Sequence, residues 1–135
     1  MAERASRFAP KRFAVALVTV VLGAVLGMEY IPLVGTYVGT LLGAFVAGLA
    51  VDEKPTLEAG VAAVVAVFGV SLAATIIGEG IVAAIIALIT VNPQTLGIAA
   101  ALSFGAGSLG AHFGNDLRDG LTRPVDESGR LPDDR

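Results

Sequence analysis

The chain contains neither cysteine nor tryptophan, and His112 is the single histidine among its 135 residues. The absence of cysteine excludes disulfide bonds, thiolate metal sites and cysteine nucleophiles. One histidine cannot supply a multi-histidine metal site, and the sequence has no nucleophile elbow, phosphate-binding loop or metalloprotease motif. We therefore expect no catalytic residues, no cofactor and no metal, and we predict that the protein is not an enzyme.

Charged residues are also scarce in this chain. They make up 16% of the residues, whereas hydrophobic residues make up 55% and the mean hydropathy is +0.79. Because a soluble domain ordinarily carries about 25% charged residues, this deficit indicates that lipid is the solvent. The sequence also lacks a basic patch large enough to predict nucleic-acid binding. The expected partner is membrane lipid, and the length fits one domain.

Four apolar stretches predict membrane-spanning helices. They cover residues 13–30, 33–51, 57–77 and 96–113. A cleaved signal peptide is the rival interpretation of the first stretch, but its apolar run is long for one and three further spans follow it. We therefore predict a basic leader at 1–12, a transmembrane domain at 13–114 and a mixed, acid-rich, disordered tail at 115–135.

The basic residues predict the orientation of these spans. With four crossings, all nine fall on one side of the membrane, and the two turns on the other side carry no Lys or Arg. Basic residues concentrate on the cytoplasmic side of membrane proteins. The predicted fold is therefore an all-α, four-helix transmembrane bundle with both termini in the cytoplasm. The nine residues are Arg4, Arg7, Lys11, Arg12, Lys54, Arg118, Arg123, Arg130 and Arg135.

The segment 81–90 has no clear place in a four-span bundle. It follows the triplet Gly78-Glu79-Gly80, and its ten apolar residues are too few to cross a bilayer. Three interpretations stay open: a re-entrant segment, an interfacial helix, or an extension of the third span beyond the membrane face. A fifth crossing is rejected because it would place the Arg-bearing tail outside.

Small residues form strips at helical spacing. The sharpest strip lies in the second span, where residues four apart share one helix face and permit close backbone approach. We interpret the strips as packing surfaces between helices of one chain, with a homo-oligomer interface or another membrane protein as the alternative. The predicted packing residues are Gly23, Gly27, Gly35, Gly39, Gly43, Ala47, Gly107 and Gly110.

Glu79 is the one acid whose depth in the membrane the sequence leaves open. An ionisable group inside a bilayer is a functional hypothesis, since burying its charge is costly. Glu79 is therefore the candidate ionic site of a small oligomeric transporter or channel. The competing interpretation is a carboxylate in an interfacial turn, which needs no function.

The chain resembles uncharacterised small haloarchaeal multi-pass membrane proteins. The resemblance rests on the basic leader, the sequence Pro32–Gly35, the glycine-zipper second span and the Gly-rich last span ending in Ala111–Gly114. In size and layout, the chain is also similar to the internal membrane proteins of haloarchaeal pleomorphic viruses. These resemblances imply no established activity. We predict a non-enzymatic structural, scaffold or accessory membrane component, with the small transporter or channel as the alternative.

Overall fold

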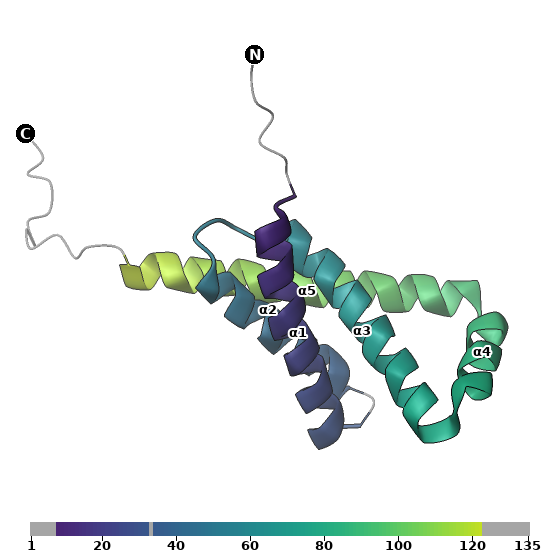
Figure 1. Cartoon of the computed structure of the whole chain (residues 1–135). Coiled ribbons are helices and arrows are strands. Elements are labelled where there is room, and N and C mark those ends of the chain that lie inside the picture. Colours follow the sequence, from purple (N-terminus) through teal and green to yellow (C-terminus); the bar gives the residue numbers. More distant parts are fainter. Residues whose placement is uncertain (1–7, 33, 123–135) are drawn as a thin grey trace, which may run out of the picture.

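The computed structural model describes residues 8–32 and 34–122, and these residues form five α-helices joined by short turns (Figure 1). No strand occurs among them, so the prediction of an all-helical protein is confirmed. Most of the predicted leader, residues 1–7, and the tail residues 123–135 lie outside the described residues. The helices are α1 (Pro10–Tyr30), α2 (Gly35–Ala50), α3 (Thr56–Glu79), α4 (Ile81–Thr90) and α5 (Pro93–Thr122).

Three of these helices are long and apolar enough to cross a membrane: α1, α3 and α5. Only three of the four predicted spans meet this measure of length and composition, because α2 has only 16 residues. The apolar stretch predicted at 33–51 includes residues that are not helical: Val34 lies in a turn and Val51 is extended. An apolar run read from sequence thus overstates the length of the helix that it contains.

α4 is a helix of its own and does not extend α3. Gly80 separates the two helices with a φ of +93°, a backbone conformation that favours glycine because a side chain would clash there. Its N–H bonds to the carbonyl of Ile76 and ends α3. The helix-extending interpretation of 81–90 is therefore wrong, whereas the re-entrant and interfacial interpretations stay predictions.

α5 is longer than the sequence predicted. It begins at Pro93, where a missing N–H costs nothing in the first turn of a helix, and continues without interruption to Thr122. The tail predicted to be disordered from residue 115 is therefore helical over its first eight residues. The reason is tertiary, because side chains of this segment are held by the loop between α2 and α3, as described below.

The five helices form a bundle with one protruding arm (Figure 1). α1 and α2 make an antiparallel hairpin, α3 lies against α1, and α5 runs across the bundle and packs on both α2 and α3. α2 and α5 run in the same direction, since Gly110 meets Leu41 and Gly114 meets Gly48. The end of α3, the whole of α4 and the start of α5 extend away from this packed part.

Alanine dominates the core, and large apolar side chains point outward. The fully buried cluster consists of Val20 and eight alanines from α1, α2, α3 and α5. By contrast, Val18 is 60% exposed, Leu22 is 59% exposed and Ile77 is 86% exposed. Small interior residues allow helices to approach closely, which is how helices associate in a bilayer where burying leucine gives little gain. The outer surface is the apolar one, as membrane contact requires.

Candidate functional site

Close backbone contacts hold α1 and α2 together along a line of glycines, which we call the glycine seam. It consists of Gly23, Gly27, Gly35, Gly39 and Gly43. A methyl group added to Gly27 would lie 1.9 Å from the carbonyl oxygen of Gly35, and one added to Gly39 would lie 1.9 Å from that of Gly23. No side chain fits in such contacts, so the seam requires glycine at these positions. The strips predicted in the first and second spans therefore face each other within one chain.

The strips of the last helix serve two different neighbours. Gly107 packs against Ala59 and Ala63 of α3, whereas Gly110 packs against Leu41 and Ala44 of α2. Ala47, the last member of the predicted strip on α2, is fully buried in the core. All the predicted packing residues thus lie at contacts between helices of the same chain.

Two further glycines of these contacts were missed by sequence reasoning. A methyl group on Gly48 would lie 2.2 Å from the carbonyl oxygen of Ala111, and one on Gly60 would lie 2.5 Å from the hydroxyl of Ser108. The signal for Gly48 was present in the sequence, because Ala44 precedes it by four residues on a neighbouring face of α2. Gly60 stands alone in an alanine-rich stretch, and no spacing marks it.

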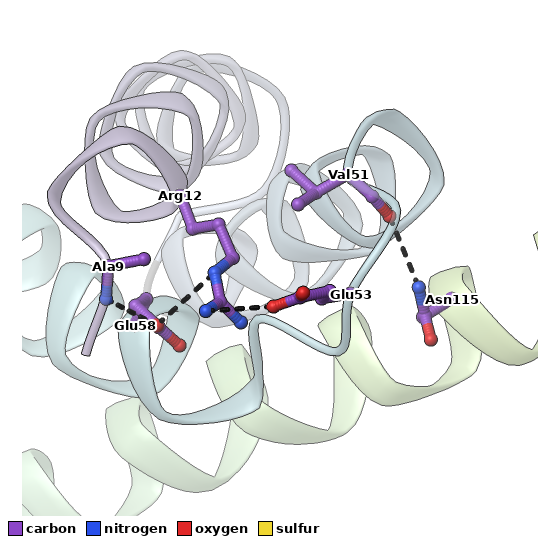
Figure 2. A network of polar contacts seen from close by, with 6 residues as sticks. All are labelled: Ala9, Arg12, Val51, Glu53, Glu58 and Asn115. Carbon is purple, nitrogen blue, oxygen red and sulfur yellow. Dashed lines mark hydrogen bonds and ion pairs between the residues drawn. The ribbon is translucent and has the colours of Figure 1, made fainter. Parts of the chain in front are cut away.

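A network of charged and polar side chains closes one end of the bundle, and we call it the polar clasp (Figure 2). Its members come from the start of α1, the loop between α2 and α3, the first turn of α3 and the end of α5. They are Arg12, Asp52, Glu53, Lys54, Glu58, Asn115, Asp116 and Arg118.

Glu58 is the buried centre of the clasp. Its side chain is 1% exposed, and its Oε1 accepts a hydrogen bond from the backbone N–H of Ala9 at 2.9 Å. The same oxygen lies 3.7 Å from Nε of Arg12, whose Nη2 lies 3.0 Å from Oε2 of Glu53 (Figure 2). Because a buried carboxylate is costly without partners, Arg12 and the start of α1 are held against α3.

The second half of α5 fastens the other side of the clasp. Nδ2 of Asn115 donates to the carbonyl of Val51 at 3.2 Å, and the hydroxyl of Ser108 donates to the carbonyl of Thr56 at 3.0 Å. Both acceptors belong to the ends of the α2–α3 connection. Arg118 also forms an ion pair with Asp52. These contacts explain why α5 stays helical beyond its apolar part.

Asp116 joins the loop to α5 at the solvent-exposed rim of the clasp. Nζ of Lys54 lies 2.9 Å from Oδ1 of Asp116, and Nε2 of His112 lies 3.2 Å from its Oδ2. The hydrogen bond from Lys54 lowers the pKa of Asp116, and the charges of His112 and Lys54 lower it further. Sequence reasoning placed Asp116 in a disordered tail and therefore missed the clasp.

Charge is distributed unequally between the two ends of the described bundle. Arg12, Lys54 and Arg118 meet in the clasp, and Lys11 precedes Arg12 in the first turn of α1. Glu79 is exposed at the last residue of α3, far along that helix from the clasp. Its role as an ionic site stays a prediction.

The part of the chain that the structure describes holds no cluster of metal-ligating side chains. Within 8–32 and 34–122, no three or more His, Asp or Glu side chains group closely enough to hold a metal ion.

Neither the curated proteins nor the solved structures contain a match to this sequence. A family model does match, over residues 10–123, and this range includes all five helices and the polar clasp. The chain belongs to the family described as the domain of unknown function DUF8526.

Proposed function

We propose that this chain is a multi-pass integral membrane protein that acts as a non-enzymatic structural or accessory component of a cell membrane. The observation that carries the proposal is the reversal of the usual distribution of apolar side chains. Alanine and glycine fill the interior, while leucine, isoleucine and valine cover the outside of every helix. A surface of this kind is stable only against hydrocarbon or another apolar surface.

In this proposal, α1, α2, α3 and α5 cross the bilayer and both termini lie in the cytoplasm. α2 spans roughly 24 Å, somewhat less than a hydrocarbon core of about 30 Å. Short helices are accommodated by local thinning of the bilayer, and α2 has α1 and α5 as packed neighbours. The gathering of Lys54, Arg12 and Arg118 at one end supports this orientation.

A structural role is supported by the way the polar groups are used. The clasp joins α1, the α2–α3 loop, α3 and α5 through buried or paired groups. The hydroxyls of Thr19, Thr40 and Ser103 donate to carbonyls of their own helices. Polar groups that form hydrogen bonds or ion pairs within the chain hold helices in place. They are poorly suited to line a path for ions, because their bonding capacity is already used. This use of polar groups supports a structural role for the bundle.

Single-cysteine labelling tests the proposed topology, because the chain has no cysteine of its own. Ile31→Cys lies in the α1–α2 turn and Asp119→Cys lies near the end of α5, and both positions are exposed. We expect a membrane-impermeant thiol reagent to label position 31 in intact cells and position 119 only after permeabilisation. Labelling of both from the same side would contradict the proposal. Val18→Cys, on the outer face of α1, should stay unlabelled throughout.

Proteoliposomes test the proposed role. We expect the purified protein to produce no ion flux across sealed vesicles under an imposed proton or sodium gradient. A flux that Glu79→Gln abolishes and Glu29→Gln preserves would overturn the structural role and assign a conduit to this family. Both acids lie at helix ends and are exposed, which makes Glu29 the matched control.

A further inference from the structure

The α1–α2 hairpin has a short apolar length. On α1, no charged residue lies between Arg12 and Glu29, and this run extends over roughly 24 Å at a rise of about 1.5 Å per residue. α2 has 16 helical residues and therefore extends over roughly the same 24 Å. The two helices of the hairpin thus agree on one length, which is shorter than a hydrocarbon core of about 30 Å.

The polar clasp fixes one end of this length. A long basic side chain can ordinarily keep its charge at the membrane surface while its backbone sinks into the hydrocarbon. Arg12 has no such freedom, because its Nη2 lies 3.0 Å from Oε2 of Glu53 and its Nε lies 3.7 Å from Oε1 of the buried Glu58. If α1 sank, it would carry these carboxylates into the hydrocarbon as well, and burying charge there is costly. The clasp therefore stays at the membrane face.

Glu29 fixes the opposite end of the same length. It is exposed in the last turn of α1, and its side chain is too short to reach far toward the headgroups in the way that lysine and arginine do. Tyr30 beside it is 81% exposed, and tyrosine rings sit at the headgroup level of bilayers. Glu29 is the one charged residue of the sequence between positions 13 and 51. It is therefore the group that limits the apolar length of the hairpin.

The other two long helices can adapt to a thin bilayer, whereas the hairpin cannot adapt to a thick one. On α3, no charged residue lies between Glu58 and Glu79, and this run extends over roughly 30 Å. A helix of this length fits a thinner layer by tilting, within the range of up to about 40° that membrane helices adopt. α5 is longer still, with 30 residues, and lies across the hairpin (Figure 1). Because tilting only shortens the distance that a helix spans, the hairpin sets the upper limit.

We infer that this protein fits a bilayer whose hydrocarbon core is about 24 Å thick beside the α1–α2 hairpin, so that its preferred lipid partners have short chains. A thicker core would bury either the carboxylate of Glu29 or the charges of the clasp. In a bilayer of ordinary thickness, the hairpin therefore draws the two surfaces together around it. This inference rests on the proposed membrane location and adds to it the class of lipid that the protein selects.

Lipid selection can be measured at the hairpin itself, because the chain has no tryptophan and one introduced tryptophan is the sole strong fluorophore. Leu22→Trp places this reporter on the outer face of α1, where Leu22 is 59% exposed. The full-length protein is reconstituted into vesicles that mix a brominated phosphatidylcholine with an unbrominated one, whose chains are varied from about fourteen to about twenty-two carbons. The loss of quenching at each length gives the relative affinity of the unbrominated lipid. We expect chains of about fourteen carbons to bind about threefold more tightly than chains of about twenty.

Equal affinity at every chain length, or a preference for the longer chains, would overturn the inference and leave the proposed membrane location intact. Val65→Trp, at an exposed position of α3, is the second reporter. If vesicles made only of brominated lipid quench Val65→Trp but not Leu22→Trp, another protein covers the hairpin, and the lipid preference is overturned. If they quench neither reporter, the proposed membrane location fails instead.

Two matched variants test whether Glu29 sets the length. In the Leu22→Trp background, Glu29→Leu removes the charge at the outer end of the hairpin, so we expect the best-bound lipid to lengthen by about two to four carbons. Glu79→Leu makes the same change at the exposed end of α3, whose charge-free run is already longer, and should leave the preference unchanged. Equal shifts for the two variants, or no shift for Glu29→Leu, would overturn the inference.

Discussion

The packed part of the bundle and the protruding arm are built from the same residue types but use them differently. Along the seam, each glycine is in backbone contact with another helix. In the arm, nothing lies within 4 Å of a methyl group added to Gly78 or Gly97. α4 likewise buries only Ala84, although isoleucine, leucine, valine and alanine make up nine of its ten residues. The number of glycines and apolar residues in a helix therefore does not reveal which helices touch. A small residue contributes to packing only where another helix lies against it.

The largest difference between the two regions is expected when one large side chain is placed in each. Gly39→Leu forces a side chain against the backbone of Gly23, so we expect a loss of about 3 kcal/mol or more in the free energy of unfolding. Gly97→Leu on the start of α5 has free space and should change stability by less than about 0.5 kcal/mol. Loss of helical circular dichroism during titration of detergent-solubilised protein with a denaturing detergent measures both. Equal losses would mean that the arm is packed as tightly as the seam.

The next effect concerns the buried carboxylate of the clasp. Arg12→Gln leaves Glu58 buried without its cation, and we expect a loss of about 2–3 kcal/mol. This is below the cost for a fully buried pair because Arg12 itself keeps some contact with solvent. The same denaturation assay applies, and Lys11→Gln is the neighbouring control with little expected change. Adding Glu58→Gln to Arg12→Gln should recover part of the loss, and a further loss in the double variant would argue against the pair.

A smaller effect should come from the clasp side of α5. Asn115→Ala removes the hydrogen bond to the carbonyl of Val51 and leaves that acceptor less satisfied, at a cost of about 1–2 kcal/mol. Hydrogen exchange should then increase in the last turns of α5 more than in α1. Gln94→Ala, at the exposed opposite end of α5, serves as the control. Unchanged exchange beyond residue 115 would mean that this segment is helical without the clasp.

The smallest predicted effect is a pH dependence at the rim of the clasp. Because the pKa of Asp116 is lowered in the folded protein, chiefly by Lys54, its ionised form favours folding. The stabilisation is fully present above the ordinary carboxyl pKa of 3.8 and is lost as the pH falls through the lowered value. The stability difference between wild type and Lys54→Gln should therefore be constant near neutral pH and shrink in acid. A difference that grows with acidification would contradict the pairing.

Much of the architecture could be predicted because it depends on composition and spacing alone. Scarce charge and long apolar stretches predicted helices suited to a membrane, and the strips on α1 and α2 lie at a helix contact because residues four apart share a face. Helix lengths were harder to predict, because an apolar residue such as Val51 counts as part of an apolar stretch whether or not its backbone is helical. The path of the chain after α3 could not be predicted from the sequence, because glycine at position 80 can adopt backbone conformations that lead in several directions.

Residue types and their periodicity are enough to establish that this protein is helical, apolar and basic at one end. The folded chain was needed to show that the seam joins α1 to α2, that Gly107 and Gly110 pack against different helices, and that Arg12, Glu58 and Asn115 meet in one clasp. Such contacts join residues that lie far apart in the chain. Their partners are chosen by how whole helices pack, which no local pattern encodes.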